Sequence, residues 1–265
     1  SELDIKKLAE KINNEPDILK IGRCVFSVAE PNNEVGEMLI KNINVDKLGE
    51  KINNEPDILK IGRCVSDVAK VNKEVAEKLV DKLAEKINNE PDIYKIVRWI
   101  DVVANANKEV TEKLVDKLAE KFNNESNIYK IVRWIAVVAK ANKEIAEKLV
   151  KKINVDNLAE KIKIEPDIKR ISWYVSVVGD TSKEVAEKLV KKINVDKLAE
   201  KINNEPDIER IGSCVSVVAK ANKEVAEKLV KKINIETLVE KMNRSDKAHE
   251  IVSLLTKIGI VSGEI

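Results

Sequence analysis

The sequence repeats one module about six times, and this repetition constrains the fold more than any other feature. Counted from Asn32, the equivalent positions are Asn72, Asn107, Asn142, Ser182 and Asn222. The spacings between them are 40, 35, 35, 40 and 40 residues. Periods in this range are typical of helical solenoids, in which each unit buries its apolar face by stacking on its neighbours. The repeat therefore predicts an all-α, right-handed α-solenoid whose working part is a surface.

Each full module predicts three helices. The first carries apolar residues at helical spacing, as at Val75, Leu79 and Leu83, and begins after Asn72, a good N-cap. Asparagines mark a break before the second helix, at Asn44, Asn154, Asn194 and Asn234. The third helix opens with an Asn-Glu-Pro-Asp turn, in which Asn caps the helix, Pro is tolerated in the first turn and Asp can close a capping box.

Two kinds of departure from the module have physical consequences. In the two 35-residue modules the five residues around the asparagine break are missing, so the first and second helices should form one continuous helix of about 18 residues. The module at 142–181 has Lys163-Ile164 in place of Asn-Asn, Gly179 in place of Ala and Thr181-Ser182 in place of Ala-Asn. We expect this module to have the weakest interfaces, because Gly disfavours a helix relative to Ala.

We expect one solenoid domain over residues 1–265. It comprises a partial repeat at 1–31, full repeats at 32–71, 72–106, 107–141, 142–181 and 182–221, and a last repeat with a C-terminal cap at 222–265. Within the cap, Leu255 aligns with Val215. Because the chain starts at a second helix, its N-terminal edge should be apolar and could drive end-to-end self-association. The charged first residues indicate no signal peptide.

The module resembles the armadillo repeat and, by extension, the HEAT repeat, in its Asn-Lys-Glu-Val, Pro-Asp-Ile and Val-Val-Ala segments. The resemblance implies that the last helix of each module lines a groove, where Trp and Asn ladders would clamp an extended peptide. The Trp position maps onto Arg23, Arg63, Arg98, Arg133, Trp173 and Ser213, and the Asn position onto Ser27, Asp67, Val102, Val137, Val177 and Val217. Since only Trp173 is retained, the resemblance does not imply clamping of a peptide backbone irrespective of its sequence.

The third helices vary mainly on the face opposite their apolar stripe. In the first module this face carries Leu19, Lys20, Arg23, Phe26, Ser27 and Glu30. Across six modules these positions hold fourteen basic and five acidic residues, a net charge of +9 in a chain whose total is +2. Such a surface favours an anionic partner. Tyr94, Tyr129 and Trp173 should be exposed there for stacking, whereas Trp99, Trp134 and Tyr174 should lie at the edge of the core.

We therefore predict a non-enzymatic binding scaffold for an acidic extended peptide or acidic protein surface. The predicted partner-binding residues are Lys20, Arg23, Lys60, Arg63, Tyr94, Lys95, Arg98, Tyr129, Lys130, Arg133, Lys169, Arg170, Trp173 and Arg210. Two alternatives remain open at this point. Nucleic acid could bind the ladder of Lys20, Lys60, Lys95, Lys130, Arg170 and Arg210. The chain could also be a structural or engineered scaffold without a natural partner.

Other classes of function find little support. Cys24, Cys64 and Cys214 share one module position, match no zinc spacing, and should be free, half-buried thiols as in cytoplasmic proteins. His249 is the single histidine and lacks a nucleophile motif nearby. There is no phosphate-binding glycine loop and no apolar run long enough for a membrane span. We expect no enzyme activity, no cofactor and no metal.

Overall fold

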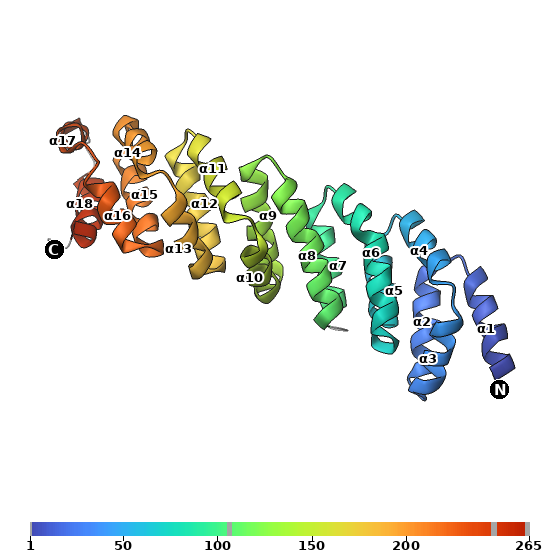
Figure 1. Ribbon diagram of the computed structural model, residues 1–265. Coiled ribbons are helices and arrows are strands. Elements are labelled where there is room, and N and C mark those ends of the chain that lie inside the picture. Colours follow the sequence, from blue (N-terminus) through green and yellow to red (C-terminus); the bar gives the residue numbers. More distant parts are fainter. Residues whose placement is uncertain (1, 105–107, 245–247, 263–265) are drawn as a thin grey trace. The chain divides into compact units, whose positions relative to one another are not determined.

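The structure is a computed structural model that describes residues 2–104, 108–244 and 248–262. Within these ranges the chain is built from helices joined by short turns, with no strand (Figure 1). The prediction of an all-α, repeat-like fold is therefore confirmed. The handedness of the stack remains a prediction.

The helices fall into two compact units. Residues Ser1–Lys121 and Lys140–Ile145 form the first unit, and Phe122–Ala139 and Ala146–Ile265 form the second. The helices up to Asn124 are α1 Glu2–Asn14, α2 Ile18–Ala29, α3 Asn33–Asn42, α4 Val45–Asn54, α5 Ile58–Val71, α6 Lys73–Asn89, α7 Ile93–Ala104 and α8 Lys108–Asn124. The later ones are α9 Ile128–Ala141, α10 Lys143–Lys152, α11 Val155–Ile164, α12 Ile168–Thr181, α13 Lys183–Lys192, α14 Val195–Asn204, α15 Ile208–Ala221, α16 Lys223–Val230, α17 Ile235–Arg244 and α18 Ala248–Ser262. The division between the two units at Lys121 and Phe122 falls inside the repeat predicted at 107–141. The predicted limits of the repeats are not tested by this division and remain a prediction.

The order of first, second and third helix follows the sequence pattern. Asn44 separates α3 from α4 and accepts a hydrogen bond from the Lys47 N–H, as an N-cap does. Asp17 is the N-cap of α2 and accepts a hydrogen bond from the Leu19 N–H. The prediction that Asn14 caps this helix, with Pro16 in its first turn and Asp17 in a capping box, was therefore wrong, because the helix begins only at Ile18. In the short modules α6 and α8 are each a single helix of 17 residues. The predicted continuous helices are therefore confirmed.

Third helices of consecutive modules pack on one another. In the first unit α2 lies against α5 and α5 against α7; in the second, α12 lies against α15 and α15 against α18. The α2 face that packs inward carries Ile18, Ile21, Gly22 and Val25, all buried. An ideal Cβ on Gly22 would lie only 2.9 Å from the Cα atom of Cys64, so glycine permits this close approach of α2 and α5.

Three asparagine side chains each connect one module to the break in the next one. The Oδ1 atom of Asn13 accepts the N–H of Asn44 at 2.9 Å, and Asn203 accepts that of Asn234 at 2.9 Å. Asn123 does the same for Asn154 at 2.8 Å. The bridge satisfies a backbone donor that the break between two helices leaves without a helical partner.

A lysine near the end of the second helix adds a further connection. The Nζ atom of Lys51 donates to the carbonyls of Asn13 and Glu15 at 2.7 and 2.6 Å. Lys201 donates to the carbonyls of Lys163 and Glu165 at 2.8 and 2.6 Å. Each ammonium therefore satisfies carbonyl groups at the C-terminal end of the preceding module's second helix. Burial lowers the pKa of both lysines.

The last module exposes apolar side chains that earlier modules bury. Leu255 is 47% exposed and Val252 62% exposed, whereas Val215, the equivalent of Leu255, is fully buried. The buried residues of α18 include Leu254 and Val261. Among the described residues of α18, apolar side chains are therefore exposed at positions that are buried in the preceding module.

The module at 142–181 offers a test of the asparagine bridge. Lys163 stands where the other modules place the bridging asparagine, and among the described residues the N–H of Asn194 has no hydrogen bond. Lys163→Asn should supply that bond and raise the free energy of unfolding by about 0.5–1.5 kcal/mol, measured by denaturant titration. Asn203→Lys, the reverse change, should lower it. If both variants unfold like the original chain, the bridges contribute nothing to stability.

Gly179 offers a second test in the same module. It lies within α12, and a Cβ there would meet only the Cβ of Ala186, at an ordinary contact distance of 3.5 Å. Gly179→Ala should therefore stabilise the protein by up to about 1 kcal/mol and raise its melting temperature. Gly36→Ala is the contrasting variant, because its Cβ would lie 2.3 Å from the Cβ of Ala29. A stabilised Gly36→Ala would contradict this packing.

Candidate functional site: the exposed face of the third helices

The structure places most predicted partner-binding residues at the surface of the third helices. Exposed side chains are those of Lys20, Arg23, Arg63, Tyr94, Lys95, Arg98, Tyr129, Lys130, Arg133, Lys169, Arg170 and Arg210. Lys60 and Trp173 are half-buried. Ser66 and Val137, which share the variable face, are buried, so that face is narrower than the sequence pattern indicated. The side chains of Trp99 and Asp101 lie outside the described residues.

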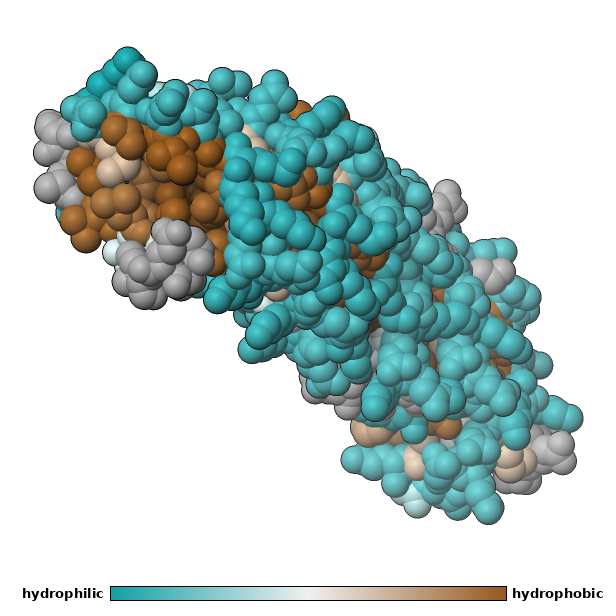
Figure 2. All heavy atoms as spheres, turned by 60° about the vertical axis from the view of Figure 1, so that its left-hand side comes forward, coloured by the Kyte–Doolittle hydropathy of each residue, from teal (hydrophilic) through white to brown (hydrophobic). Residues whose placement is uncertain are grey.

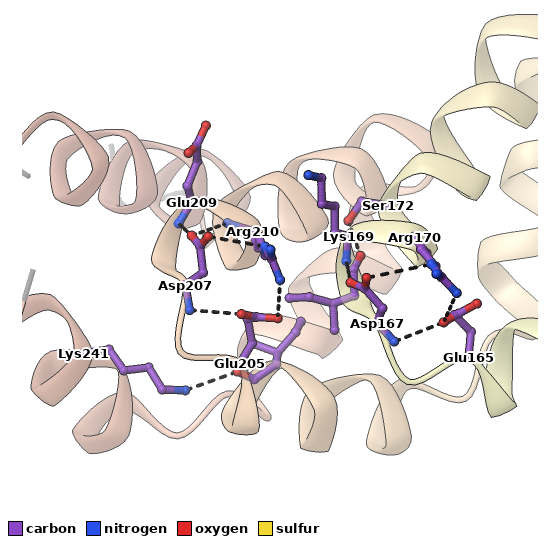
Figure 3. A network of polar contacts seen from close by, with 12 residues as sticks. Glu165, Asp167, Lys169, Arg170, Ser172, Glu205, Asp207, Glu209, Arg210 and Lys241 are labelled. Carbon is purple, nitrogen blue, oxygen red and sulfur yellow. Dashed lines mark hydrogen bonds and ion pairs between the residues drawn. The ribbon is translucent and has the colours of Figure 1, made fainter.

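One row of bases is paired with carboxylates of its own modules. We call Lys20, Lys60, Lys130, Arg170 and Arg210 the paired row. Each lies 3.7–4.0 Å from the glutamate of the Glu-Pro-Asp or Glu-Ser-Asn turn that opens its helix. Figure 3 shows two of these turns, with Arg170 beside Glu165 and Asp167, and Arg210 beside Glu205 and Asp207.

The same turns cap the third helices. The Oε1 atom of Glu205 accepts the N–H of Asp207 at 3.1 Å, and Asp207 in turn accepts the N–H groups of Glu209 and Arg210. Negative charge is stabilising at a helix N-terminus. The net charge of +9 on the variable face therefore overstates the field there, because it leaves out these neighbouring carboxylates.

A second row of bases has no such partners. We call Arg23, Arg63 and Arg98 of the first unit the arginine row, which lies one turn further along the helices; Arg133 holds the same module position in the second unit. Among the described residues these guanidinium groups form no hydrogen bond and no ion pair within 4 Å. Asp67 is the acidic group near Arg23 and Arg63; its half-buried carboxyl pairs with Lys70 at 3.6 Å. Within the described residues, the two rows therefore differ in whether a carboxylate lies within 4.0 Å of the basic group.

Aromatic residues of the second unit form a cluster on this face. The Tyr129 and Trp173 rings lie 5.5 Å apart, and those of Trp173 and Tyr174 lie 5.6 Å apart. Tyr129 is 44% exposed, but the prediction that Trp173 is exposed was wrong, because its two neighbours cover it. In the first unit Tyr94 is 59% exposed.

Trp134 is half-buried. Tyr174 is fully buried, so the prediction that it lies at the edge of the core was wrong. Its hydroxyl donates to the Oε2 atom of Glu165 at 2.8 Å. Burial and this carboxylate raise the pKa of Tyr174. The Tyr174–Glu165 pair thus fixes the turn that also holds Arg170. The sequence signal was the replacement of Cys by Tyr at this module position.

A hollow of about 320 Å³ lies where α12, α13 and α15 meet. Its walls include Asp180 and Lys220 of the variable face, with Lys183 from α13. The sequence did not predict this hollow. The sequence feature that could have indicated the hollow is Gly179, which lines it and stands where the other modules have Ala.

The structure shows no chemistry-bearing cluster within its described residues. No group of three or more His, Cys, Asp or Glu is placed to hold a metal ion. His249 is exposed. The three free thiols were predicted to be half-buried. This was wrong, because Cys64 and Cys214 are buried and Cys24 is exposed. Burial raises the pKa of Cys64 to about 12 and that of Cys214 to about 11. Absence of enzyme activity remains a prediction.

The fold defines this chain as an all-helical, repeat-like protein. No helix in the described ranges is long and apolar enough to cross a membrane. No protein-family model matches the chain, and no curated protein is similar to it. A solved structure described as "Computational Design of Self-Assembling Cyclic Protein Homooligomers" aligns with 99% of this chain and 94% of its own, at 14% identity and a TM-score of 0.19. A TM-score this low carries no inference about the present chain.

Asp67 gives a test of the electrostatics of the arginine row. Burial is the main cause that raises the pKa of its carboxyl, so the folded state disfavours the ionised form. The free energy of unfolding should then fall as the pH rises from the ordinary aspartate pKa through the raised one. Asp67→Asn should stabilise the protein at about pH 7 but not at about pH 3. An equal effect at both pH values would contradict this account.

Proposed function

We propose that this protein is a non-enzymatic binding scaffold whose arginine row holds an acidic, extended peptide or an acidic protein surface. The observation that carries the proposal is the exposure of these guanidinium groups without hydrogen bonds or ion pairs among the described residues. Guanidinium groups bind carboxylates through two parallel hydrogen bonds, so each unpaired arginine can take one acidic side chain. Tyr94, which is exposed in the same unit, would add a stacking contact beside the row. We extend the proposal to an armadillo- or HEAT-type stack as the framework.

The packing of the first unit suggests the spacing of the acidic residues. Helices α2, α5 and α7 carry Arg23, Arg63 and Arg98 and pack consecutively. Packed helices lie about 8–10 Å apart. An extended peptide in the polyproline II conformation advances about 3.1 Å per residue and returns to the same side every three residues, so an acidic residue at every third position would meet successive arginines.

Nucleic acid is less well supported. Of the six bases in the ladder proposed for phosphate binding, five belong to the paired row, where a carboxylate already lies within 4.0 Å. A polyanion would have to compete with these carboxylates and with the capping aspartates next to them. No observation in the structure favours that reading over the acidic peptide.

The test is a titration of the protein with a peptide that carries Glu at every third position. The triple variant Arg23→Glu, Arg63→Glu and Arg98→Glu should weaken binding at least about tenfold, equivalent to about 1.4 kcal/mol. Asp67→Asn should tighten binding, because it removes the negative charge beside Arg23 and Arg63. Both effects should shrink at high salt.

A matched control separates the site from net charge. Lys47, Lys78 and Lys197 are exposed on first and second helices, and their reversal to Glu changes the total charge by the same amount. This control should bind the peptide nearly as well as the original chain. The proposal fails if both triple variants lose affinity equally, or if a peptide of the same composition with its Glu residues clustered binds as tightly. Tighter binding of single-stranded nucleic acid than of either peptide would instead support the ladder.

A further inference from the structure

Three contacts between consecutive third helices use the same two module positions. We call them the donor position (Gly22, Gly62, Val97, Val132, Ser172, Gly212 and Val252) and the acceptor position (Cys24, Cys64, Trp99, Trp134, Tyr174, Cys214 and Leu254). A Cβ on Gly22 would touch Cys64, and one on Gly212 would lie 3.4 Å from Leu254. The thiol of Cys214 hydrogen-bonds the Ser172 side chain. The donor position of one module thus faces the acceptor position of the next.

Among the described side chains, one donor residue and one acceptor residue are exposed. Every donor residue is buried except Val252 on α18, which is 62% exposed. The acceptor residue Cys24 on α2 is exposed, whereas Cys64, Tyr174, Cys214 and Leu254 are buried. The two exposed residues are therefore the two halves of a contact that the rest of the protein makes repeatedly.

Neighbouring residues repeat this complementarity. Beside Val252, Leu255 is 47% exposed, and Val239 on α17 is exposed although its equivalent Ala199 is buried. Figure 2 shows the resulting apolar area at the end formed by α17 and α18. Near Cys24, Leu8 on α1 is 36% exposed although its equivalent Leu48 is buried. Exposed apolar side chains therefore occur at the α18 end as well as at the N-terminal edge, for which the sequence predicted self-association.

We propose that these two surfaces bind each other in two copies of this chain, α18 of one copy packing on α2 of the next. Val252 would lie against Cys24 of the second copy, as Gly212 lies against Leu254 within one chain. The second copy is the occupant because its α2 surface offers the residues that face this position in the interior contacts. Such head-to-tail binding uses two different surfaces, so it can add further copies.

Lysine contacts support the same arrangement. Lys51, Lys201 and Lys241 each donate to carbonyls at the end of the preceding module's second helix. Lys11, at the equivalent position of α1, is exposed. Continuing the pattern would bring its ammonium group to the carbonyl of Asn243 at the end of α17 in the other copy. This inference does not depend on the proposed peptide site.

Oxidative cross-linking tests the pairing directly. The closeness of Gly22 to Cys64 shows that donor and acceptor positions approach within the reach of a disulfide, which joins Cβ atoms about 3.5–4.5 Å apart. Val252→Cys should therefore form disulfides with Cys24 of other copies under mild oxidation, giving a ladder of covalent multimers on a non-reducing gel. Cys64 and Cys214 are buried and do not compete. The double variant Val252→Cys with Cys24→Ser should give no ladder.

Sedimentation of end-blocked variants gives an independent measurement. Leu255→Glu blocks the α18 surface and Cys24→Glu blocks the α2 surface, so each variant alone should be a monomer while the original chain gains mass with concentration. An equimolar mixture should form dimers and nothing larger, because one competent surface of each kind remains. Ile164→Glu, at an exposed position of α11, should behave like the original chain. Helical circular dichroism confirms that each variant is folded.

Three results would overturn the proposal. One is a mass of the original chain that stays at the monomer value at every concentration. Another is dimers of the Cys24→Glu variant alone, or cross-linked dimers of the Val252→Cys, Cys24→Ser variant, which would mean that two α18 surfaces bind each other. The third is a mixture of end-blocked variants that remains monomeric.

Discussion

The close packing of consecutive third helices is the interaction on which the rest of this structure depends. A small residue on one helix admits the next helix closely: Gly22 approaches the backbone of Cys64, and Gly212 the side chain of Leu254. This packing buries the apolar side of the third helices and leaves their opposite side at the surface. It also sets the distance between equivalent side chains on neighbouring helices, and therefore the spacing of the arginine row.

Local charge pairing then decides which basic residues remain available. The glutamates of the turns accept backbone hydrogen bonds at the start of the third helices and pair with bases five residues later, as Glu205 does with Asp207 and Arg210. These bases therefore form ion pairs with the turn at the start of their own helix. Bases eight residues after the same glutamates, such as Arg63 after Glu55, lie one turn further along the helix and form no ion pair with these glutamates among the described residues. A count of charge along one face of a helix does not separate these two groups, whereas the distances do.

The sequence predicted what local pattern determines. The five-residue deletion in the two short modules correctly predicted the continuous helices α6 and α8. In the other modules asparagine marked the break between two helices, as Asn44 does. Contacts between modules were not predictable in this way. The bridge from Asn13 to Asn44 spans 31 residues, and the burial of Trp173 depends on Tyr129 of the neighbouring helix. Periodicity shows which face of a helix is apolar, but Val252 shows that another helix need not cover it.

Peptide binding and head-to-tail association would use adjacent but different faces of the same helix. Arg23 belongs to the arginine row, while Cys24, its neighbour on α2, belongs to the surface that packs on another helix. At the arginine position the later third helices carry Trp173, Ser213 and Ser253. A second copy docked on α18 would therefore not continue the basic row directly, because uncharged positions precede its Arg23. Each copy would present its own arginine row, and association would raise the number of binding sites without lengthening any one of them.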